Sequence, residues 1–478
     1  MESPVGVKGR KWQAADDSVN FKKNETMKTR MTKVSLAVCK ELCTFAEDKK
    51  EEIMSPIKNA LRLLSFVMCL LIMLVGCSVF QKKSVTQIAA ETEEDYKLND
   101  EQRIIVSKGN DFSFKIFKKI AESEKDNNVF VSTIGMFYSL NIINNGASGQ
   151  TQQEICKAMN IAPSDIKAIN ELCRRFIIGQ AKIRENKDYG PSSYMRTATL
   201  FQMGEDIDLN NSFQDVLEHD YFAGVIKGNI DSKLQNEINE WCSEQTDGII
   251  DNLPIERKDS ESANLLVANY FNGRWIQKFY KEDTKTEPFY SGTCSEVEMM
   301  NESEEENLFT YSKLDDFSLL KIPYVGGYRL YVILPEKPNG LVELLQSLDN
   351  EKIRDAMHQL KNYTRVNVKL PKFKVDYLFK ANDYLKSMGI SRMFGKTSDL
   401  DRIHTEQMKI ADIKQKAKVI LDEDGTRASA ITSTSFVTLC SYANATEANF
   451  YADHPFAYII TDPFGNYCFM GTFWGYKD

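Results

Sequence analysis

Histidine is scarce in this chain, with only four among its 478 residues. The sequence also lacks a GxSxG nucleophile motif, an HExxH zinc-binding motif and a glycine-rich phosphate-binding loop. Histidine is a frequent general acid, general base or metal ligand in enzymes, and these motifs mark common hydrolase and nucleotide-binding sites. We therefore expect that the protein is not an enzyme and that it has no catalytic residues of its own.

Cysteine pairs with metal-binding spacing are also missing. Six of the ten cysteines lie in the main part of the chain, and none of the six forms a CxxC pair or lies beside a histidine cluster. Because a zinc site needs such spacing, we expect no metal and no cofactor. Buried structural thiols are the expected role of these residues, which are Cys156, Cys173, Cys242, Cys294, Cys440 and Cys468.

An excess of positive charge is lacking as well. The formal net charge is −8, and no basic run is interleaved with aromatic residues, so nucleic acid is not an expected partner. The composition, with 42% hydrophobic and 27% charged residues, is that of a globular protein. No linker rich in proline, glycine or serine divides residues 98–478. We expect a single domain there.

Helical spacing is visible near the start of this domain. Phe112, Ile116 and Ile120 would share one face of a helix, because residues three and four apart lie on the same side. Asn110 and Asp111 precede them and are candidate N-caps. The pattern predicts a helix that begins near residue 112.

Strand patterns appear in the second half. Val366, Val368 and Leu370 alternate with polar residues, which predicts a half-buried strand. The segments 456–460 and 467–470 flank a turn with proline and glycine and predict a hairpin. Helices and strands are interspersed without a regular βαβ order, so the expected fold class is α+β.

The most informative segment runs from Lys416 to Thr438, where a strand-like sequence leads into a long loop of small, β-branched and hydroxylated residues. In an extended conformation one face of this loop would carry small uncharged side chains, and Arg427 would lie on the other face. The loop has no proline, so every N–H group could join a sheet. Composition alone fits a loop that becomes a strand and an ordinary polar surface loop or edge strand equally well. The uncharged face would be Thr426, Ala428, Ala430, Thr432 and Thr434.

The start of this loop resembles the hinge of the serpins, a family of suicide protease inhibitors. The hinge pattern is an acidic pair, a glycine, a threonine, one variable residue and then small residues. In this chain it is formed by Glu423, Asp424, Gly425, Thr426, Arg427, Ala428, Ser429 and Ala430.

Further motifs resemble serpin motifs and occur in the family's order from about residue 98 to the C-terminus. The stretch 269–275 is similar to the segment that crosses the main sheet and ends at a buried tryptophan. The stretches 146–149, 450–456 and 469–471 resemble an early helix signature and the two C-terminal strand signatures. The resemblance implies a serpin fold, with three β-sheets, about eight to nine helices, an exposed reactive-centre loop and a monomeric state.

The function implied by the resemblance is suicide inhibition of a serine protease. In this family the protease cuts the loop as a substrate and forms a covalent acyl complex, and the freed N-terminal limb then inserts as a strand into the main sheet. Counting seventeen residues from Glu423, as in most inhibitory serpins, places the cut between Leu439 and Cys440. A different loop length would move the cut to a neighbouring bond. The apolar residue before the cut, with no lysine or arginine at 434–448, implies a chymotrypsin-like or elastase-like target.

The resemblance also implies a polar cluster beneath the middle strands of the main sheet, at the point where the sheet must part. A cluster of this kind would influence how readily the sheet opens. The residues expected to control sheet opening are Ser132, Asn269, Gln415 and Trp275.

Three positions depart from the family pattern around this cluster. Gln415 stands where histidine is usual, Thr133 where proline is usual and Gly135 where a second serine is usual. The amide of Gln415 could bond Asn269, but it does not titrate. The departures put the energetics of sheet opening, and so the efficiency of inhibition, in question.

An uncharged run from Leu63 to Phe80 lies near the N-terminus. If translation starts at Met54, residues 54–77 have the basic and apolar regions of an export signal. Residues 74–77, with the sequence Leu-Val-Gly-Cys, resemble the lipobox of bacterial lipoproteins, in which the cysteine is lipidated. Lipid chains on Cys77 would hold the protein at a membrane.

Two alternatives stay open for this run. It has the minimum length of a transmembrane helix, or it is a hydrophobic leader whose Cys77 has no role. Residues 1–53 contain no recognisable motif and are expected to be an upstream extension that is not native, or a cytoplasmic segment. Residues 78–97 would be a linker. We expect an exported domain outside the cytoplasm, as a cell-envelope lipoprotein or a membrane-anchored protein.

Two other functions are compatible with the same motifs. A non-inhibitory serpin could act as a binding or carrier protein, and an anchored adhesion module could retain the fold without the inhibitory mechanism. The small, uncharged hinge face favours the inhibitor, because a carrier has no need of an insertable strand.

Overall fold

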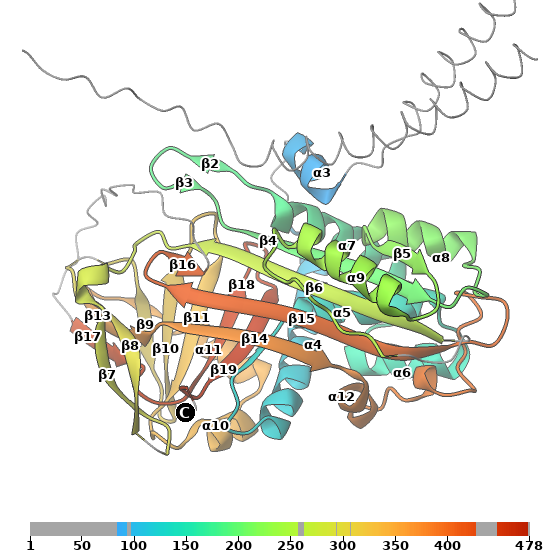
Figure 1. Ribbon diagram of the computed structural model, residues 1–478. Coiled ribbons are helices and arrows are strands. Elements are labelled where there is room, and N and C mark those ends of the chain that lie inside the picture. Colours follow the sequence, from blue (N-terminus) through green and yellow to red (C-terminus); the bar gives the residue numbers. More distant parts are fainter. Residues whose placement is uncertain are drawn as a thin grey trace, which may run out of the picture. The chain divides into compact units, whose positions relative to one another are not determined.

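The computed structural model describes residues 84–92, 97–256, 262–292, 294–305, 307–426 and 447–476, all within one compact unit. Helices and three main β-sheets are interspersed along the chain (Figure 1), which confirms the expected α+β class. The α-helices of the described ranges are α3 (Val85–Glu91), α4 (Asp100–Ser123), α5 (Thr133–Gly146), α6 (Gly149–Met159), α7 (Ile166–Ala181), α8 (Asn211–Asp215), α9 (Ser232–Gln245), α10 (Leu341–Ser347), α11 (Asn350–His358) and α12 (Asn382–Ser387).

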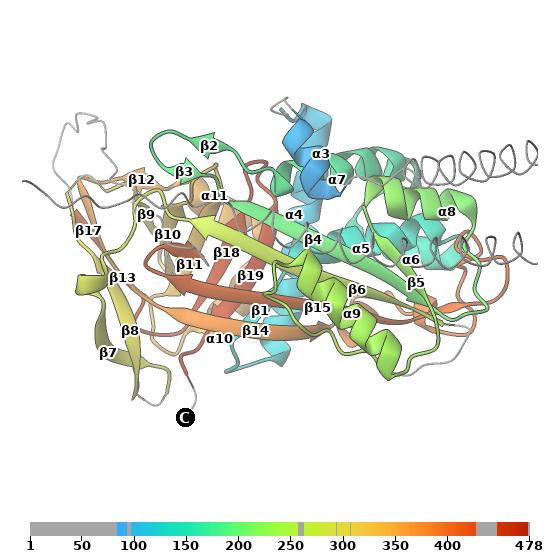
Figure 2. The same ribbon diagram turned by 45° about the horizontal axis from the view of Figure 1, so that its top comes forward.

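The main sheet has six strands in the order β14-β15-β16-β6-β4-β5. Its central strand β6 is buried almost throughout, as expected of a strand that is covered on both faces. Helix α9 crosses the front of the sheet, and α4 and α5 lie behind it (Figures 1 and 2). The strands are β14 (Phe373–Lys380), β15 (Lys409–Asp422), β16 (Gly425–Thr426), β6 (Ser262–Arg274), β4 (Tyr194–Met203) and β5 (Gly224–Lys227).

Helix α9 covers the front face with an apolar side. Ile238 is fully buried and packs in one cluster with Leu200 of β4 and Leu266 of β6. The helix begins at an Asp231 cap, whose side chain accepts the N–H of Leu234. Together, the cap and the apolar contacts fix the helix against the sheet.

The second sheet has seven strands in the order β1-β19-β18-β11-β10-β9-β12. Strands β18 and β19 pair antiparallel, which confirms the predicted C-terminal hairpin. Phe130 of β1 stacks on Phe469 of β19, with ring centroids 4.8 Å apart. The strands are β1 (Val129–Val131), β19 (Tyr467–Phe473), β18 (Phe456–Thr461), β11 (Arg329–Pro335), β10 (Phe317–Pro323), β9 (Thr310–Lys313) and β12 (Lys361–Asn362).

The third sheet has four strands in the order β17-β13-β8-β7. Along β13, Val366, Val368 and Leu370 are buried and alternate with half-buried polar residues, as the sequence predicts. A separate small hairpin joins β2 and β3. The strands are β17 (Glu447–Tyr451), β13 (Arg365–Pro371), β8 (Cys294–Glu302), β7 (Lys285–Tyr290), β2 (Glu185–Asn186) and β3 (Gly190–Pro191).

Helix α4 starts earlier than predicted. Its N-cap is Asn99, which forms a capping box with Gln102, so the prediction that Asn110 and Asp111 cap this helix is wrong. Asn110 lies inside the helix, and its side chain bonds the backbone of the β18–β19 turn, donating to the Gly465 carbonyl and accepting from the N–H of Tyr467. Local sequence does not reveal a partner more than 350 residues away.

The expected linker at residues 78–97 contains helix α3, which packs against α7. Residues 1–53 and 54–77, with Cys77, lie outside the described residues. Within the described ranges, no helix combines the length and the apolar character needed to cross a membrane.

Candidate functional site

The base of the hinge already lies within the main sheet. The two-residue strand β16 lies between the C-terminal ends of β15 and β6 and pairs antiparallel with both. Gly425 is opposite Asp422 of β15 and Arg274 of β6. On the N-terminal side of this point β15 and β6 pair directly and in parallel, and the last direct pair is Ala417 with Asn269. The two strands are therefore separated only at their C-terminal ends, where β16 lies between them.

Gly425 is required by its conformation and by its surroundings. Its φ angle is +147°, a backbone region that side chains with a Cβ rarely adopt. A Cβ at this position would lie 2.1 Å from the carbonyl oxygen of Gly273 on β6. The glycine expected from the hinge pattern thus permits the close approach of two backbones.

Thr426 is held by a tyrosine that directly follows strand β10 of the second sheet. Its hydroxyl lies 2.6 Å from the hydroxyl of Tyr324, and both residues are buried. The Tyr324 ring stacks on Trp275 at 4.1 Å, and the Trp275 indole N–H donates to the Asp422 carbonyl. Sequence reasoning missed the role of Tyr324, because this residue lies about a hundred positions before the hinge.

The first acidic residue of the hinge is bound by two donors. The carboxylate of Glu423 accepts from the Thr284 hydroxyl at 2.7 Å and from the Lys372 ammonium at 3.0 Å. Burial acts to raise the pKa of Glu423, but the hydrogen bonds from Thr284 and Lys372 outweigh it and lower the pKa. Both donors are distant from the hinge in the sequence, so local patterns do not reveal these contacts.

The second acidic residue is paired with lysines. Asp424 lies 2.6 Å from Lys278 and 3.4 Å from Lys281. Burial opposes ionisation of Asp424, but these partners lower its pKa. Beside it, the Asp422 carboxylate accepts the N–H groups of Asp424 and Gly425, although burial raises its pKa. The acidic turn is thus fixed to the body by side chains and backbone together.

The polar cluster beneath the sheet differs in detail from the prediction. The Gln415 amide bonds both backbone groups of Ser132, accepting from the N–H at 2.7 Å and donating to the carbonyl at 2.8 Å. Asn269 donates to the Thr197 hydroxyl, and its Oδ1 atom has no partner among the described residues. The suggested hydrogen bond between Gln415 and Asn269 is therefore wrong, because Ser132 occupies the Gln415 amide.

Three members of the expected cluster surround one glycine. A Cβ on Gly135 would lie 2.8 Å from Asn269 Oδ1, 3.0 Å from Gln415 Nε2 and 3.1 Å from Ser132 Oγ. Trp275 is six residues beyond Asn269 on the same extended segment and contacts the hinge, so the structure separates it from this cluster. The cluster lies where the direct pairing of β15 with β6 ends.

The rest of the loop lies outside the described residues. The predicted alternation of its faces and the position of the cut stay predictions. They concern Arg427, Ala428, Ser429, Ala430, Leu439 and Cys440.

Four free thiols in the described part of the chain are buried. Burial raises the pKa of the Cys242 thiol to about 12, so this group is a weak nucleophile at neutral pH. In the same part of the chain, no group of three or more histidine, cysteine, aspartate or glutamate residues could hold a metal ion. The buried free cysteines are Cys156, Cys173, Cys242 and Cys468.

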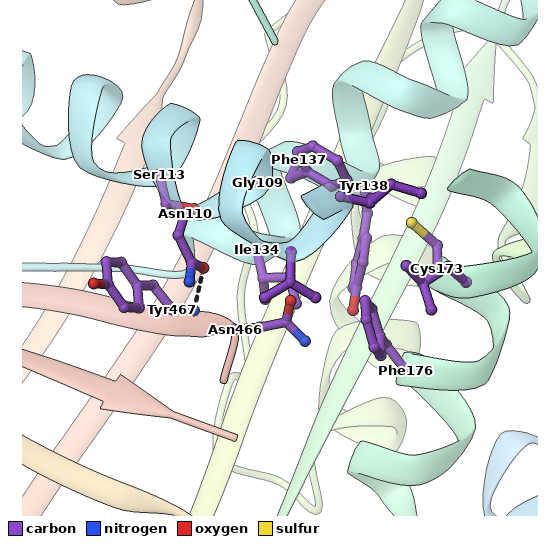
Figure 3. A pocket seen from close by; sticks show the side chains of 13 residues that line it. Gly109, Asn110, Ser113, Ile134, Phe137, Tyr138, Cys173, Phe176, Asn466 and Tyr467 are labelled. Carbon is purple, nitrogen blue, oxygen red and sulfur yellow. Dashed lines mark hydrogen bonds between the residues drawn. The ribbon is translucent and has the colours of Figure 1, made fainter. Parts of the chain in front are cut away.

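A small cavity lies among α4, α5 and α7 (Figure 3). Gly109, Phe137, Tyr138 and Cys173 are among its lining residues. The volume in which the centre of a water-sized sphere can lie is about 10 Å³, which is enough for about one water molecule. This space is too small for a carried organic ligand.

Comparisons with known proteins agree with this geometry. A family model described as Serpin (serine protease inhibitor) matches residues 107–475. Human Serpin B3 is 29% identical over 381 residues, covering 73% of this chain and 93% of its own length. Serine proteinase inhibitor 2 of variola virus is 28% identical over 364 residues, covering 75% of this chain and 98% of its own length.

Solved structures share the same fold. Serpin48 of the insect Tenebrio molitor superposes with a TM-score of 0.66 at 25% identity, covering 80% of this chain and all of its own. Human thyroxine-binding globulin, solved in complex with thyroxine, gives a TM-score of 0.68 at 19% identity, covering 78% of this chain and 98% of its own. The matched region contains the docked hinge, the polar cluster and all three main sheets. The chain belongs to the serpin family.

Proposed function

We propose that this protein is a suicide inhibitor of a chymotrypsin-like or elastase-like serine protease and not an enzyme. The observation that carries the proposal is strand β16, because Gly425 and Thr426, the first residue of the insertable face, already occupy the position of a new strand between β15 and β6. The next residues of that face, Ala428 and Ala430, are small and uncharged. They can follow Thr426 into the sheet without burying a charge.

The reaction begins as ordinary proteolysis. The serine hydroxyl of the target attacks the carbonyl carbon of Leu439, the amide bond to Cys440 breaks, and the new amino group of Cys440 takes a proton. Leu439 is then joined to the protease by an ester. The limb that ends at Leu439 is free to extend β16, carrying the protease with it before water can hydrolyse the ester.

Insertion must separate β15 from β6 along the part where the two strands still pair directly, beyond the docked hinge. The first direct pair to open is Ala417 with Asn269, next to the buried polar cluster. Each backbone group released from this pairing can bond the incoming strand, so the ladder is replaced on both sides. The Gln415 amide bonds Ser132 below the sheet and does not hold β6 directly.

A covalent adduct tests the inhibitor function. The purified protein is mixed with chymotrypsin, elastase, a subtilisin-like enzyme and trypsin, and a denaturing gel is examined for a product of the combined mass. We expect an adduct with one or more of the first three enzymes. Mass spectrometry should show that the released peptide begins at Cys440. Cleavage without any adduct would instead favour the carrier function.

Two substitutions of equal charge on opposite faces provide the control. Ala428→Arg places a charge on the inserting face, and Ser429→Arg places the same charge on the face toward solvent. We expect Ala428→Arg to convert the inhibitor into a substrate, because the charge cannot be buried in the sheet. Ser429→Arg should still form the adduct.

We further propose that the domain acts as a monomer outside the cytoplasm, held at the cell envelope by lipid on Cys77. The support is the Leu-Val-Gly-Cys sequence after an apolar run, and a simple hydrophobic anchor is the alternative. Cys77→Ala should release the protein from the membrane fraction if lipid is the anchor. Retention of the variant at the membrane would favour the hydrophobic anchor.

A further inference from the structure

Glu302 is a buried acid at the end of β8. The residue is 3% exposed. One carboxylate oxygen accepts the N–H of Glu304 at 2.7 Å, and the other, Oε2, is buried without a partner among the described residues. A carboxylate in this position is costly to ionise, because one oxygen has lost water and gained no donor.

The charges that act on Glu302 are negative. Burial, the charge of Glu304 and the charge of Asp283 raise the pKa of Glu302 to about 7, although the backbone N–H groups of Glu304 and Ser303 act to lower it. The Tyr280 phenol is another titratable group nearby, and it is uncharged near neutral pH because its pKa is raised. Three basic residues of the neighbouring segments are paired with other acids. These pairs are Arg365 with Glu305 and Glu447, Lys369 with Glu287, and Lys281 with Asp424.

A short helical turn connects Glu302 to the hinge. This turn, η3 (Lys281–Asp283), packs on β8, and its Asp283 carbonyl accepts from the side chain of Asn301, the residue before Glu302. At its other end Lys281 lies 3.4 Å from Asp424 of the hinge. The next residue, Thr284, donates to Glu423 of the hinge. The same four residues therefore face the buried acid on one side and the acidic pair of the hinge on the other.

We propose that Glu302 is a proton-controlled switch that sets how firmly η3 holds the hinge in its docked position. Neutral Glu302 tolerates Asp283 and Glu304, so the turn keeps its contacts with Glu423 and Asp424. Ionised Glu302 repels Asp283, which shifts the turn and weakens those contacts. The hinge is released as the pH rises through neutrality. A change in the rate of loop insertion would be the functional consequence, and only that consequence depends on the proposed inhibitor function.

Hydrogen exchange of the native full-length protein tests the switch without any protease. The reporters are the N–H groups of Trp275 and Phe279, which donate to the carbonyls of Asp424 and Glu423. We expect their protection factors, corrected for the intrinsic effect of pH, to fall roughly tenfold from pH 6 to pH 8.5. In Glu302→Gln, which stays neutral, protection should remain at its pH 6 level throughout.

Two further variants make the result specific. Glu296→Gln removes an exposed acid from the same strand and should keep the pH dependence of the unmodified protein. Asp283→Asn removes one repelling charge and so lowers the pKa of Glu302, and its loss of protection should begin at lower pH and be smaller. The switch is refuted if the unmodified protein shows no change across this range, or if Glu302→Gln changes as the unmodified protein does. If Glu302→Gln fails to fold, Asp283→Asn provides the test. The switch is then refuted if protection in Asp283→Asn depends on pH as it does in the unmodified protein.

Discussion

The hydroxyl group of Tyr324 lies 2.6 Å from that of Thr426, and the contact joins the hinge to a residue that follows strand β10 of the second sheet. Both residues are buried, so the hydrogen bond is made away from water. Tyr324 also stacks on Trp275, which bonds the backbone of the hinge turn. The docked state of β16 therefore depends on side chains outside the main sheet.

Tyr324→Phe should loosen the docked hinge. The substitution keeps the ring stacked on Trp275 and removes the hydrogen bond, at a cost of about 1 kcal/mol. We expect hydrogen exchange of the Thr426 segment to become about fivefold faster. Tyr331→Phe, on β11, removes a hydroxyl that does not contact Thr426 and is the control. Equal exchange in the Tyr324 variant and the unmodified protein would show that this bond does not hold the hinge.

Gly425→Ala should prevent docking altogether. The variant combines an unfavourable backbone conformation, about 1–2 kcal/mol, with a Cβ that would lie 2.1 Å from the Gly273 oxygen. Gly389→Ala is the matched control, because Gly389 has a φ of +91° but a Cβ at this position would meet no atom within 4 Å. We expect the melting temperature to fall clearly more for Gly425→Ala. Similar losses in the two variants would mean that backbone conformation alone explains the glycine.

The fold class was accessible from local sequence patterns, and the hinge was accessible from its resemblance to the serpin motif. The strand of Val366 and Val368, and the Gly425 turn, follow from side-chain alternation and from backbone conformation. The contact of Tyr324 with Thr426 and the use of Gln415 by Ser132 were not, because they join side chains that are distant in the sequence. Residue type shows that a polar group needs a partner, but only packing determines which one it finds.

The acidic pair of the hinge should make the protein less stable in acid. Because the folded-state pKa values of Glu423 and Asp424 are lowered, their stabilising effect is complete above the pKa of the unfolded chain. It is lost as the pH falls through the folded-state values. We expect melting temperatures measured from pH 6 to pH 3 to fall less steeply for Glu423→Gln than for the unmodified protein. The exposed variant Glu296→Gln should follow the unmodified curve, and parallel curves for all three proteins would contradict the prediction.

Gly109→Ala should stabilise the protein by about 1 kcal/mol, because alanine has the higher helix propensity. A Cβ on Gly109 of α4 would meet the Phe137 ring at 3.6 Å, an ordinary contact, beside the small cavity of Figure 3. Gly179→Ala in α7 is the opposite case, since its Cβ would lie 2.9 Å from the Phe464 ring. Urea unfolding should give a higher midpoint for the first variant and a lower one for the second. A lower midpoint for Gly109→Ala would show that the cavity cannot accept a methyl group.

Gly135 and Gln415 should be coupled, since both depart from the family pattern and meet in one cluster. Gly135→Ser alone crowds Gln415 Nε2 and Asn269 Oδ1, which would lie 3.0 and 2.8 Å from the new Cβ, and we expect a loss of about 1–3 kcal/mol. Gln415→His alone leaves at least one of the two buried backbone groups of Ser132 without a partner, because an imidazole cannot make both bonds of the amide, and we expect a loss of similar size.

The double variant Gly135→Ser with Gln415→His should be more stable than the sum of the single losses implies. Removal of the Gln415 amide makes room at position 135, and the new serine hydroxyl can donate to Asn269 Oδ1, which has no partner among the described residues. We expect a coupling free energy of about 1 kcal/mol or more from a double-mutant cycle of urea unfolding. Additive losses would contradict this coupling. A favourable coupling would mean that glycine at position 135 leaves the room that the Gln415 side chain needs in place of histidine. The sheet would then open over a cluster that carries no titratable group.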